Sequence, residues 1–187
     1  MQLGRLPDQS QPHDSAQPGP TSAQVRSIGN GFAGTAQTLR YMRNFARDAI
    51  RDPNQFIRLH TIDVLRASGV EPRQYGQEVR ACQRFVRDQI VYVQDPVDVE
   101  LVQTPLKTLE IGYGDCDDKS TLLAAMLESI GHPCKFAAVG FNGGDFSHVL
   151  VQTKIGDVWV WCETILAGIE AGWCPPGISK AYFLKVS

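Results

Sequence analysis

Between residues 35 and 91, apolar residues recur every three or four positions. This spacing is typical of helices that bury one face and expose the other. It predicts three helices: one that ends at Arg51, a second between Pro53 and Gly69, and a third over residues 76–90. Proline at a helix start and glycine at a helix end agree with these bounds. The first half of the chain is therefore expected to form a helical layer.

Beyond Gly131 the pattern changes, because apolar and polar residues alternate there with the period of two that strands show. Gly156 and Asp157 lie between two such runs and suit a tight hairpin turn. Successive runs of this kind favour an antiparallel sheet. The predicted strands are residues 134–141, 146–154, 158–164 and 181–186.

Two features lie between these patterns. Val91–Val93 leads into a segment with Pro96 and Pro105, which we interpret as a loop. After Cys116 the apolar residues return at helical spacing and end at Gly131, so one more helix is expected there. Helices that come first and antiparallel strands that come last are the layout of the α+β class.

Residues 1–34 have a different composition, rich in Gln, Pro, Ser and Gly, and their few apolar residues show no period. Such a segment buries too little apolar surface to order itself, so we expect an extended or disordered arm. The remaining residues, 35–187, suit a single domain. Within it we expect a helical layer over residues 35–91 and the functional core over residues 92–187.

No stretch of the sequence has the charged start and apolar run of a signal peptide, and none approaches the length of a membrane span. The five cysteines are an odd number without a CxxC pair, which favours reduced thiols over disulfides or a metal site. We therefore expect a protein of the cytoplasm, or of the host cytoplasm for a viral protein, with no membrane partner and no cofactor.

The net charge of −2 conceals a separation of charges along the chain. All twelve arginines lie at or before Arg87 and all six lysines at or after Lys107, so residues 35–91 carry +4 and residues 92–187 carry −6. Such arginine-rich faces are most often simply solvated, and the alternative is docking on an acidic partner, with nucleic acid disfavoured. Four arginines form a stripe on the first predicted helix: Arg40, Arg43, Arg47 and Arg51.

The segment Gly112–Ser120, with the sequence GYGDCDDKS, is the most informative motif of the chain. Its two glycines bracket a turn that places Cys116 in the first turn of the following helix. Unpaired backbone N–H groups and the helix dipole favour a thiolate there, which is how a nucleophilic cysteine is commonly activated. The neighbouring Asp117 and Asp118 act in the opposite direction, because nearby carboxylates raise the pKa of a thiol.

His148 and Glu163 lie in the two strands that flank the predicted hairpin turn. If Ile155 pairs with Val158 across a two-residue turn, Glu163 is a diagonal neighbour of His148. If the turn has four residues, the two side chains face each other directly. In both registers they share one face of the sheet, whereas a turn one residue longer would separate them.

These residues suit nucleophilic catalysis by a Cys-His-acid triad. Cys116 would attack an amide or ester carbonyl, His148 would take its proton and later protonate the leaving amine, and Glu163 would hold the imidazole tautomer. The backbone N–H of Cys116 is the natural first donor to the oxyanion. The second donor stays open among three side chains: Tyr92, Gln103 and Tyr113.

Several segments resemble the transglutaminase-like superfamily, whose bacterial and phage members are often called transglutaminase-like cysteine peptidases. The resemblance covers about residues 76–165. It is carried by residues 114–120 with Leu122 and Leu123, by Ser147–Val149 and by Trp159–Thr164, and the approach to the cysteine at residues 90–93 and 105–109 is similar as well.

The resemblance implies a papain-like arrangement, in which a helix that carries the cysteine packs against a small antiparallel sheet that carries the histidine and the acid. One position departs from the family pattern. The third residue of the family's triad is usually Asp, and Glu163, one methylene longer, stands at the matching place here.

The residues and the resemblance together predict a cysteine enzyme that cleaves an amide bond of a peptide or protein through an acyl-enzyme. Hydrolysis is favoured over acyl transfer because nothing in the chain suggests a site for a second amine substrate. The alternative is an assembly component of a tailed-phage virion, with auxiliary or lost activity. In that case residues 1–34 and the arginine stripe would dock on other phage structural proteins. A nucleic-acid-binding module is a third hypothesis.

Overall fold

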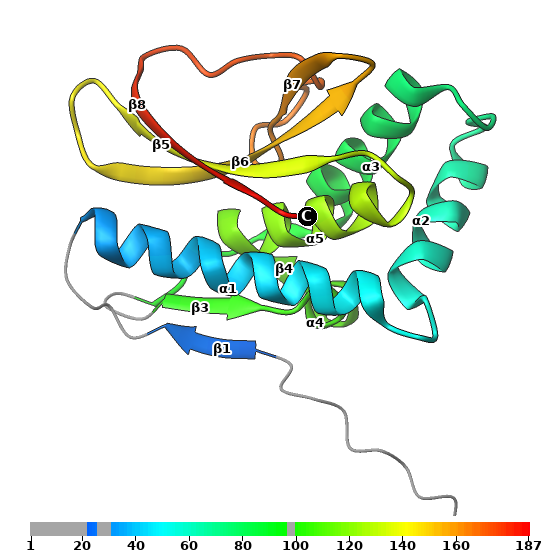
Figure 1. Cartoon of the computed structure of the whole chain (residues 1–187), viewed down its shortest axis with the longest axis horizontal. Coiled ribbons are helices and arrows are strands. Elements are labelled where there is room, and N and C mark those ends of the chain that lie inside the picture. The colour runs from blue at the N-terminus through cyan, green and yellow to red at the C-terminus, as the bar shows by residue number, and fades with distance from the viewer. Residues whose placement is uncertain (1–21, 26–30, 97–99) are drawn as a thin grey trace, which may run out of the picture.

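Helix α5 (Cys116–Ser129) lies at the centre of the fold, between a sheet and the other helices (Figure 1). The computed structural model describes residues 22–25, 31–96 and 100–187. Eleven of the fourteen residues of α5 are buried, and the apolar ones lie on all its sides. A helix of this kind is stable only when other elements surround it. The sheet and helices α1 to α4 do so.

Three amphipathic helices precede α5, as predicted: α1 (Phe32–Arg51), α2 (Phe56–Ala67) and α3 (Tyr75–Gln89). Their buried faces contribute fully buried side chains such as Met42, Ile57 and Val79 to the core around α5. Helix α2 begins three residues after Pro53, because Asp52 accepts the backbone N–H of Asn54 (3.1 Å) and closes a turn there.

The predicted strands form one antiparallel sheet with the order β7-β6-β5-β8. Ile155 pairs with Val158, so Gly156 and Asp157 form the predicted hairpin turn and the first of the two registers is confirmed. The last strand begins three residues earlier than predicted, at Ile178. The strands are β5 (Cys134–Phe141), β6 (Phe146–Ile155), β7 (Val158–Cys162) and β8 (Ile178–Lys185).

The segment between α3 and α5 is more ordered than the predicted loop. β2 (Val91–Tyr92) pairs in parallel with β4 (Tyr113–Gly114), and β3 (Glu100–Gln103) and α4 (Pro105–Ile111) lie between them. Pro105 begins a helix instead of marking a loop. Thr104 caps this helix by accepting the N–H of Lys107 (3.3 Å), and a proline at the first helical position lacks only an N–H that needs no partner.

Part of the predicted N-terminal arm is folded. β1 (Ser22–Val25) pairs antiparallel with β3, and α1 begins at Phe32. Helix α1 thus begins within the expected arm, and a strand whose partner lies far along the chain leaves no mark in local composition. The prediction for residues 1–21 and 26–30 concerns residues outside the described part of the chain.

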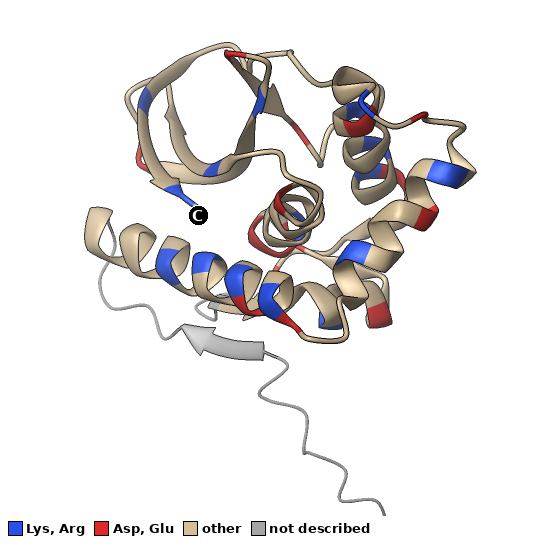
Figure 2. Ribbon diagram, turned by 45° about the vertical axis from the view of Figure 1, so that its right-hand side comes forward, with Lys and Arg blue, Asp and Glu red and all other residues tan. Residues whose placement is uncertain are grey.

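Basic residues form a row along α1 (Figure 2), as the charge separation predicts. One of them belongs to the fold itself, because the Arg47 side chain donates a hydrogen bond to the carbonyl of Val186, just beyond β8. Among the described residues, none of the helices has the length and apolar character needed to cross a membrane.

Candidate active site

A capping box holds the first turn of α5. Asp115 Oδ1 accepts the backbone N–H groups of Asp117 (2.9 Å) and Asp118 (3.2 Å), and the Asp118 carboxylate accepts the N–H of Asp115 in return (3.3 Å). Cys116 is the first residue of the helix, where the motif predicts it. Its position is thus fixed by the backbone hydrogen bonds of its neighbours.

The two glycines of the motif are required for different reasons. Gly112 ends α4 with a φ of 73°, a left-handed conformation that glycine adopts without strain. Gly114 leaves room for the cap, because a Cβ at this position would lie 2.6 Å from Cβ of Asp118. Much of the motif therefore shapes the turn that delivers Cys116.

Cys116 is half-buried against β6. Burial raises the pKa of its thiol well above the ordinary value, and the Asp117 and Asp115 carboxylates raise that pKa further, whereas a hydrogen bond from the backbone N–H of Val149 lowers it. The expected preference of a helix N-terminus for the thiolate is therefore outweighed. The opposing effect predicted for Asp117 is confirmed, whereas the second carboxylate that raises this pKa is Asp115 and not Asp118.

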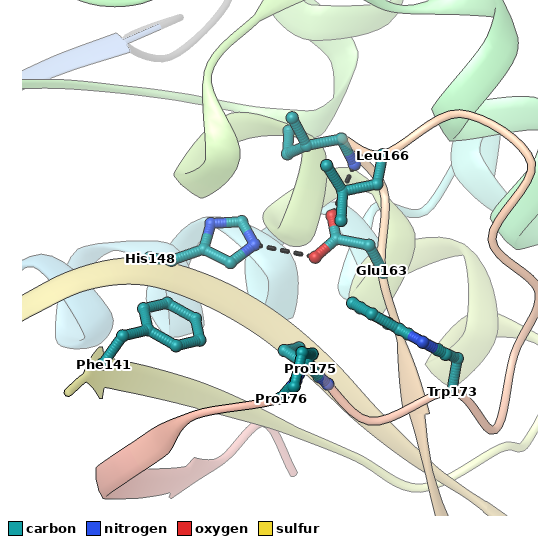
Figure 3. A pocket seen from close by; sticks show the side chains of 8 residues that line it. Phe141, His148, Glu163, Leu166, Trp173, Pro175 and Pro176 are labelled. Atoms are coloured by element: carbon teal, nitrogen blue, oxygen red, sulfur yellow. Dashed lines mark hydrogen bonds and ion pairs between the residues drawn. The ribbon is translucent and has the colours of Figure 1, made fainter.

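His148 and Glu163 form a hydrogen-bonded pair, with 2.9 Å between His148 Nε2 and Glu163 Oε2 (Figure 3). His148 lies at a bulge of β6, since Val139 pairs with His148 but Gly140 pairs with Phe146. Bulges of this kind redirect side chains and are common beside active sites. The next residue of β6 is Val149, whose N–H reaches the sulfur of Cys116. Cys116 therefore lies beside the strand residue that follows His148.

The Glu163 carboxylate is almost completely buried, with 2% of its side chain exposed. Oε1 accepts the N–H of Ile165 (2.6 Å). Burial alone would raise the pKa of Glu163, but the hydrogen bond and charge of His148 and the N–H groups of Ile165 and Leu166 outweigh it and lower the pKa. An ionised Glu163 acts only as an acceptor, so it holds the imidazole proton on Nε2 and leaves Nδ1 as the basic nitrogen.

Two buried polar residues for which the sequence predicted no role hold together the elements around this pair. Gln83 Nε2 donates to the carbonyl of Glu163 (2.7 Å). Lys119 Nζ donates to the carbonyl of Ile90 (2.6 Å) and joins α5 to the end of α3. Burial lowers the pKa of Lys119 to about 8, although the Asp88 and Glu163 carboxylates act against this.

Gln83 could have been identified from the sequence. It lies four residues after Val79, on the face of α3 that carries the buried apolar residues. A polar residue within an apolar face must find a hydrogen-bond partner inside the protein.

The candidate oxyanion donors differ in their surroundings. Gln103 donates both its backbone N–H and its Nε2 to the Asp118 carboxylate (2.7 Å each), so its side chain is engaged in holding β3 against α5. Burial raises the pKa of Tyr92, and an ionised Cys116 raises it further.

A cavity of about 460 Å³ opens beside the His148–Glu163 pair (Figure 3). Apart from these two residues its walls are apolar and come from the end of β5 and from the segment that follows β7. The apolar residues are Phe141, Ile165, Leu166, Trp173, Pro175 and Pro176.

The other four cysteines differ in exposure. Cys82, Cys134 and Cys162 are buried, whereas Cys174 is exposed. Cys174 follows Trp173 at the cavity, in a segment without regular secondary structure. Burial raises the pKa of Cys82 and Cys162 to about 12, which leaves both unreactive near neutral pH.

His132 has a structural role. Its Nε2 lies 2.7 Å from Glu78 Oε2, and this buried pair ties the segment after α5 to α3. Among the described residues there is no group of three or more His, Cys, Asp or Glu residues that could hold a metal ion.

Comparisons with known proteins bear on the family and the fold of the chain. A model of the transglutaminase-like superfamily matches residues 64–175, more than half of the chain. A "putative protease" from Parabacteroides distasonis ATCC 8503 has a similar structure, with a TM-score of 0.51 and 12% identity over 67% of this chain and 26% of that one. For a "putative cysteine protease" from Cytophaga hutchinsonii the TM-score is 0.43 and the identity 18%, over 56% of this chain and 36% of that one. The chain thus spans only about a quarter to a third of these proteins. A search of curated proteins found no match.

Proposed function

We propose, since this chain belongs to the transglutaminase-like superfamily, that it hydrolyses an amide bond of a peptide or protein through a thioester with Cys116. The superfamily supports cysteine-based catalysis in general. The assignment of His148 as the base and Glu163 as its orienting acid is our proposal. The observation that carries it has two parts. His148 forms a hydrogen bond with the buried Glu163. Val149, which follows His148 on β6, donates its backbone N–H to the Cys116 sulfur.

In the proposed reaction, His148 Nδ1 takes the proton of the Cys116 thiol while the sulfur forms a bond to the carbonyl carbon of the amide. The carbonyl oxygen becomes an oxyanion, to which the Cys116 backbone N–H and the Tyr92 hydroxyl donate. The imidazolium then protonates the amine nitrogen, and the C–N bond breaks. Water loses a proton to His148 and attacks the thioester, which releases the carboxylic acid and restores the thiol.

The raised pKa of Cys116 bears on the first step. Because burial and the Asp117 and Asp115 carboxylates raise the pKa of the thiol, the proposed first step transfers the proton to His148 as the sulfur attacks the carbonyl. Glu163 contributes by stabilising the imidazolium that forms in this step. We favour hydrolysis over acyl transfer because we identify no site for a second amine among the described residues.

The proposed acyl-enzyme can be trapped with p-nitrophenyl acetate, a reactive ester. We expect a burst of nitrophenol and, by peptide mapping, an acetyl group on Cys116. The burst should disappear in Cys116→Ala and slow by roughly 10²-fold or more in His148→Ala. Exposed Cys174 serves as an internal control, whose acetylation should not change. Acetylation confined to Cys174, or unaffected by His148→Ala, would contradict the proposal.

The second candidate function is that of an assembly component of a tailed-phage virion. The observation that favours it is the exposure of Arg40 and Arg51 on α1, where no ion pair involves either residue within the described part of the chain. Replacing both by Glu should release the chain from phage particles during co-sedimentation, and added salt should weaken the unmodified complex. Arg66→Glu, an exposed arginine on α2, is the matched control.

A further inference from the structure

We propose that the cavity beside His148 and Glu163 binds an uncharged apolar side chain, aromatic or branched aliphatic, on the substrate residue next to the cleaved amide. This inference deepens the proposed function and rests on it for the position of the amide. Figure 3 shows the apolar side chains around the open space, with the imidazole of His148 at one side of it.

Hydrogen bonds from neighbouring elements hold the walls of the cavity in place. Gly172 N–H donates to the carbonyl of Trp161 (2.8 Å) and so ties the segment after β7 back to that strand. Ile169 is held through its carbonyl by Gln83 (3.1 Å) and Arg87 (2.5 Å), both on α3. The cavity is therefore preformed, and a ligand would not have to order it.

Both oxygens of the one carboxylate in the walls are already engaged. Glu163 Oε1 accepts the N–H of Ile165, and Oε2 accepts from His148. The walls contain no Lys or Arg. A carboxylate in the cavity would lose its hydration and meet the charge of Glu163, whereas an ammonium group would find its one acidic partner already bound. An uncharged apolar group meets neither cost and is stabilised by the apolar area it buries.

Size and position agree with one side chain of a peptide. The volume of about 460 Å³ lies within the range of roughly 300–1,000 Å³ that is common for ligand sites, and it accommodates a large aromatic ring. Because His148 is part of the wall, the backbone of a residue whose side chain fills the cavity would pass beside the imidazole. The scissile amide would then lie next to that residue.

Binding can be measured without catalysis, in the Cys116→Ala chain. The probes are N-acetyl-phenylalaninamide and its aspartate and lysine counterparts. The readout is the NMR signal of the indole N–H of Trp173, which lines the cavity, with Trp159 on β7 as the internal reference. We expect a saturable shift of the Trp173 signal with the phenylalanine probe, and at least a 10-fold weaker response to the charged probes. Equal responses to all three probes would overturn the proposal.

Specificity can be measured with chloromethyl ketones of N-acetyl-phenylalanine and N-acetyl-aspartate, by the rate at which each modifies Cys116. Leu166→Lys places a cation in the wall at a half-exposed position, so the ratio of the two rates should shift toward aspartate by at least 10-fold. Val158→Lys is the matched control, since Val158 is an exposed apolar residue at the hairpin, outside the cavity. An unchanged ratio in Leu166→Lys would count against the cavity as the specificity site.

The two proposals fail in distinguishable ways. If p-nitrophenyl acetate acylates Cys116 but the probes do not discriminate, the function stands and the assignment of the cavity is wrong. If Cys116 is not acylated but the phenylalanine probe shifts the Trp173 signal, an apolar binding site stands and its link to a cleaved amide is wrong.

Discussion

Glu163 reaches His148 as a diagonal neighbour across the hairpin of β6 and β7, and not as its direct partner. The pairing of Ile155 with Val158 at the hairpin turn determines which residues of β6 and β7 lie opposite each other, and so places Glu163 diagonal to His148. Because side chains alternate along a strand, one residue more in the turn would move Glu163 to the other face of the sheet. The side chain of Glu, longer than that of Asp, spans the diagonal with a 2.9 Å hydrogen bond.

Glu163→Gln should slow the acylation of Cys116 without abolishing it. An amide at this position can donate to His148 Nε2 and so favour the wrong tautomer, and it no longer stabilises the imidazolium. We expect a loss of roughly 10- to 10⁴-fold in the rate of the p-nitrophenyl acetate burst. Glu170→Gln, an exposed glutamate on the same segment, is the control and should keep its rate. A normal rate in Glu163→Gln would remove Glu163 from the proposed triad.

Asp117→Asn should make Cys116 react faster with iodoacetamide near neutral pH. Burial is the largest cause of the raised thiol pKa and remains in the variant, but the next largest cause, the Asp117 carboxylate, is lost. The thiol pKa therefore falls, and the pH profile of alkylation, measured by peptide mapping, should move to lower pH. Cys174 in the same digest is the reference thiol. A shift to higher pH would show that Asp117 assists the reaction.

The sequence predicts elements well where a local pattern and the final contacts agree. Residues 134–141 become β5 with the expected bounds, because this mostly apolar strand is buried on both faces and has a neighbour on each side. The cysteine motif is equally local, since its turn and cap lie within seven residues of each other. β1 and β3 escape notice because each is short and finds its partner far away in the sequence.

Asp118 should make the protein less stable as the pH rises toward neutrality. Burial raises the pKa of Asp118 from an ordinary 3.8 to about 7, and the nearby Asp115 carboxylate adds to this. The folded state then binds a proton between these values that the unfolded state has lost, so the free energy of unfolding falls over this interval.

The contribution is fully present below about pH 3.8 and lost as the pH passes about 7. Urea titrations at several pH values should show wild type losing stability relative to Asp118→Asn over this range. The difference is at most about 4 kcal/mol at about 1.4 kcal/mol per unit. Asp157→Asn, at the exposed hairpin turn, should follow wild type. Parallel pH curves for wild type and Asp118→Asn would refute this prediction.

Lys119→Met should destabilise the fold, although it removes a buried charge. The ammonium donates to the carbonyls of Ile90 (2.6 Å) and Arg87 (3.2 Å), and a methionine of similar shape would leave both without this donor. Unsatisfied buried acceptors cost about 1–3 kcal/mol each, so two of them predict a loss of about 2–6 kcal/mol in urea titrations. Lys107→Met removes an i,i+3 surface pair and should cost less than about 1 kcal/mol. A variant as stable as wild type would show that desolvation of the charge cancels its hydrogen bonds.

The burial of Lys119 illustrates what the motif analysis leaves open. In the sequence, Lys119 is one of several charged residues at a helix start. No neighbouring residue indicates that the end of α3 packs against it and accepts its hydrogen bond. The same holds for Cys116. Its position at the start of a helix was predictable from the sequence, but whether its surroundings raise or lower the thiol pKa was not. That direction depends on how deeply β6 covers the sulfur and on the strand residue, Val149, that donates to it.

Removal of β1 should weaken the site as well as the fold. β1 pairs with β3, and Gln103 at the end of β3 donates twice to Asp118, which caps the helix that carries Cys116. Deletion of residues 1–25 leaves that edge of β3 without its partner strand. We expect a loss of about 2 kcal/mol, since each backbone hydrogen bond contributes roughly 0.5–1.5 kcal/mol, and a slower burst at Cys116. Deletion of residues 1–21 keeps β1 and is the matched control, which should retain both the stability and the burst. If the two truncated chains behave alike, β1 does not support the site, and the route from β3 through Asp118 to Cys116 is incorrect.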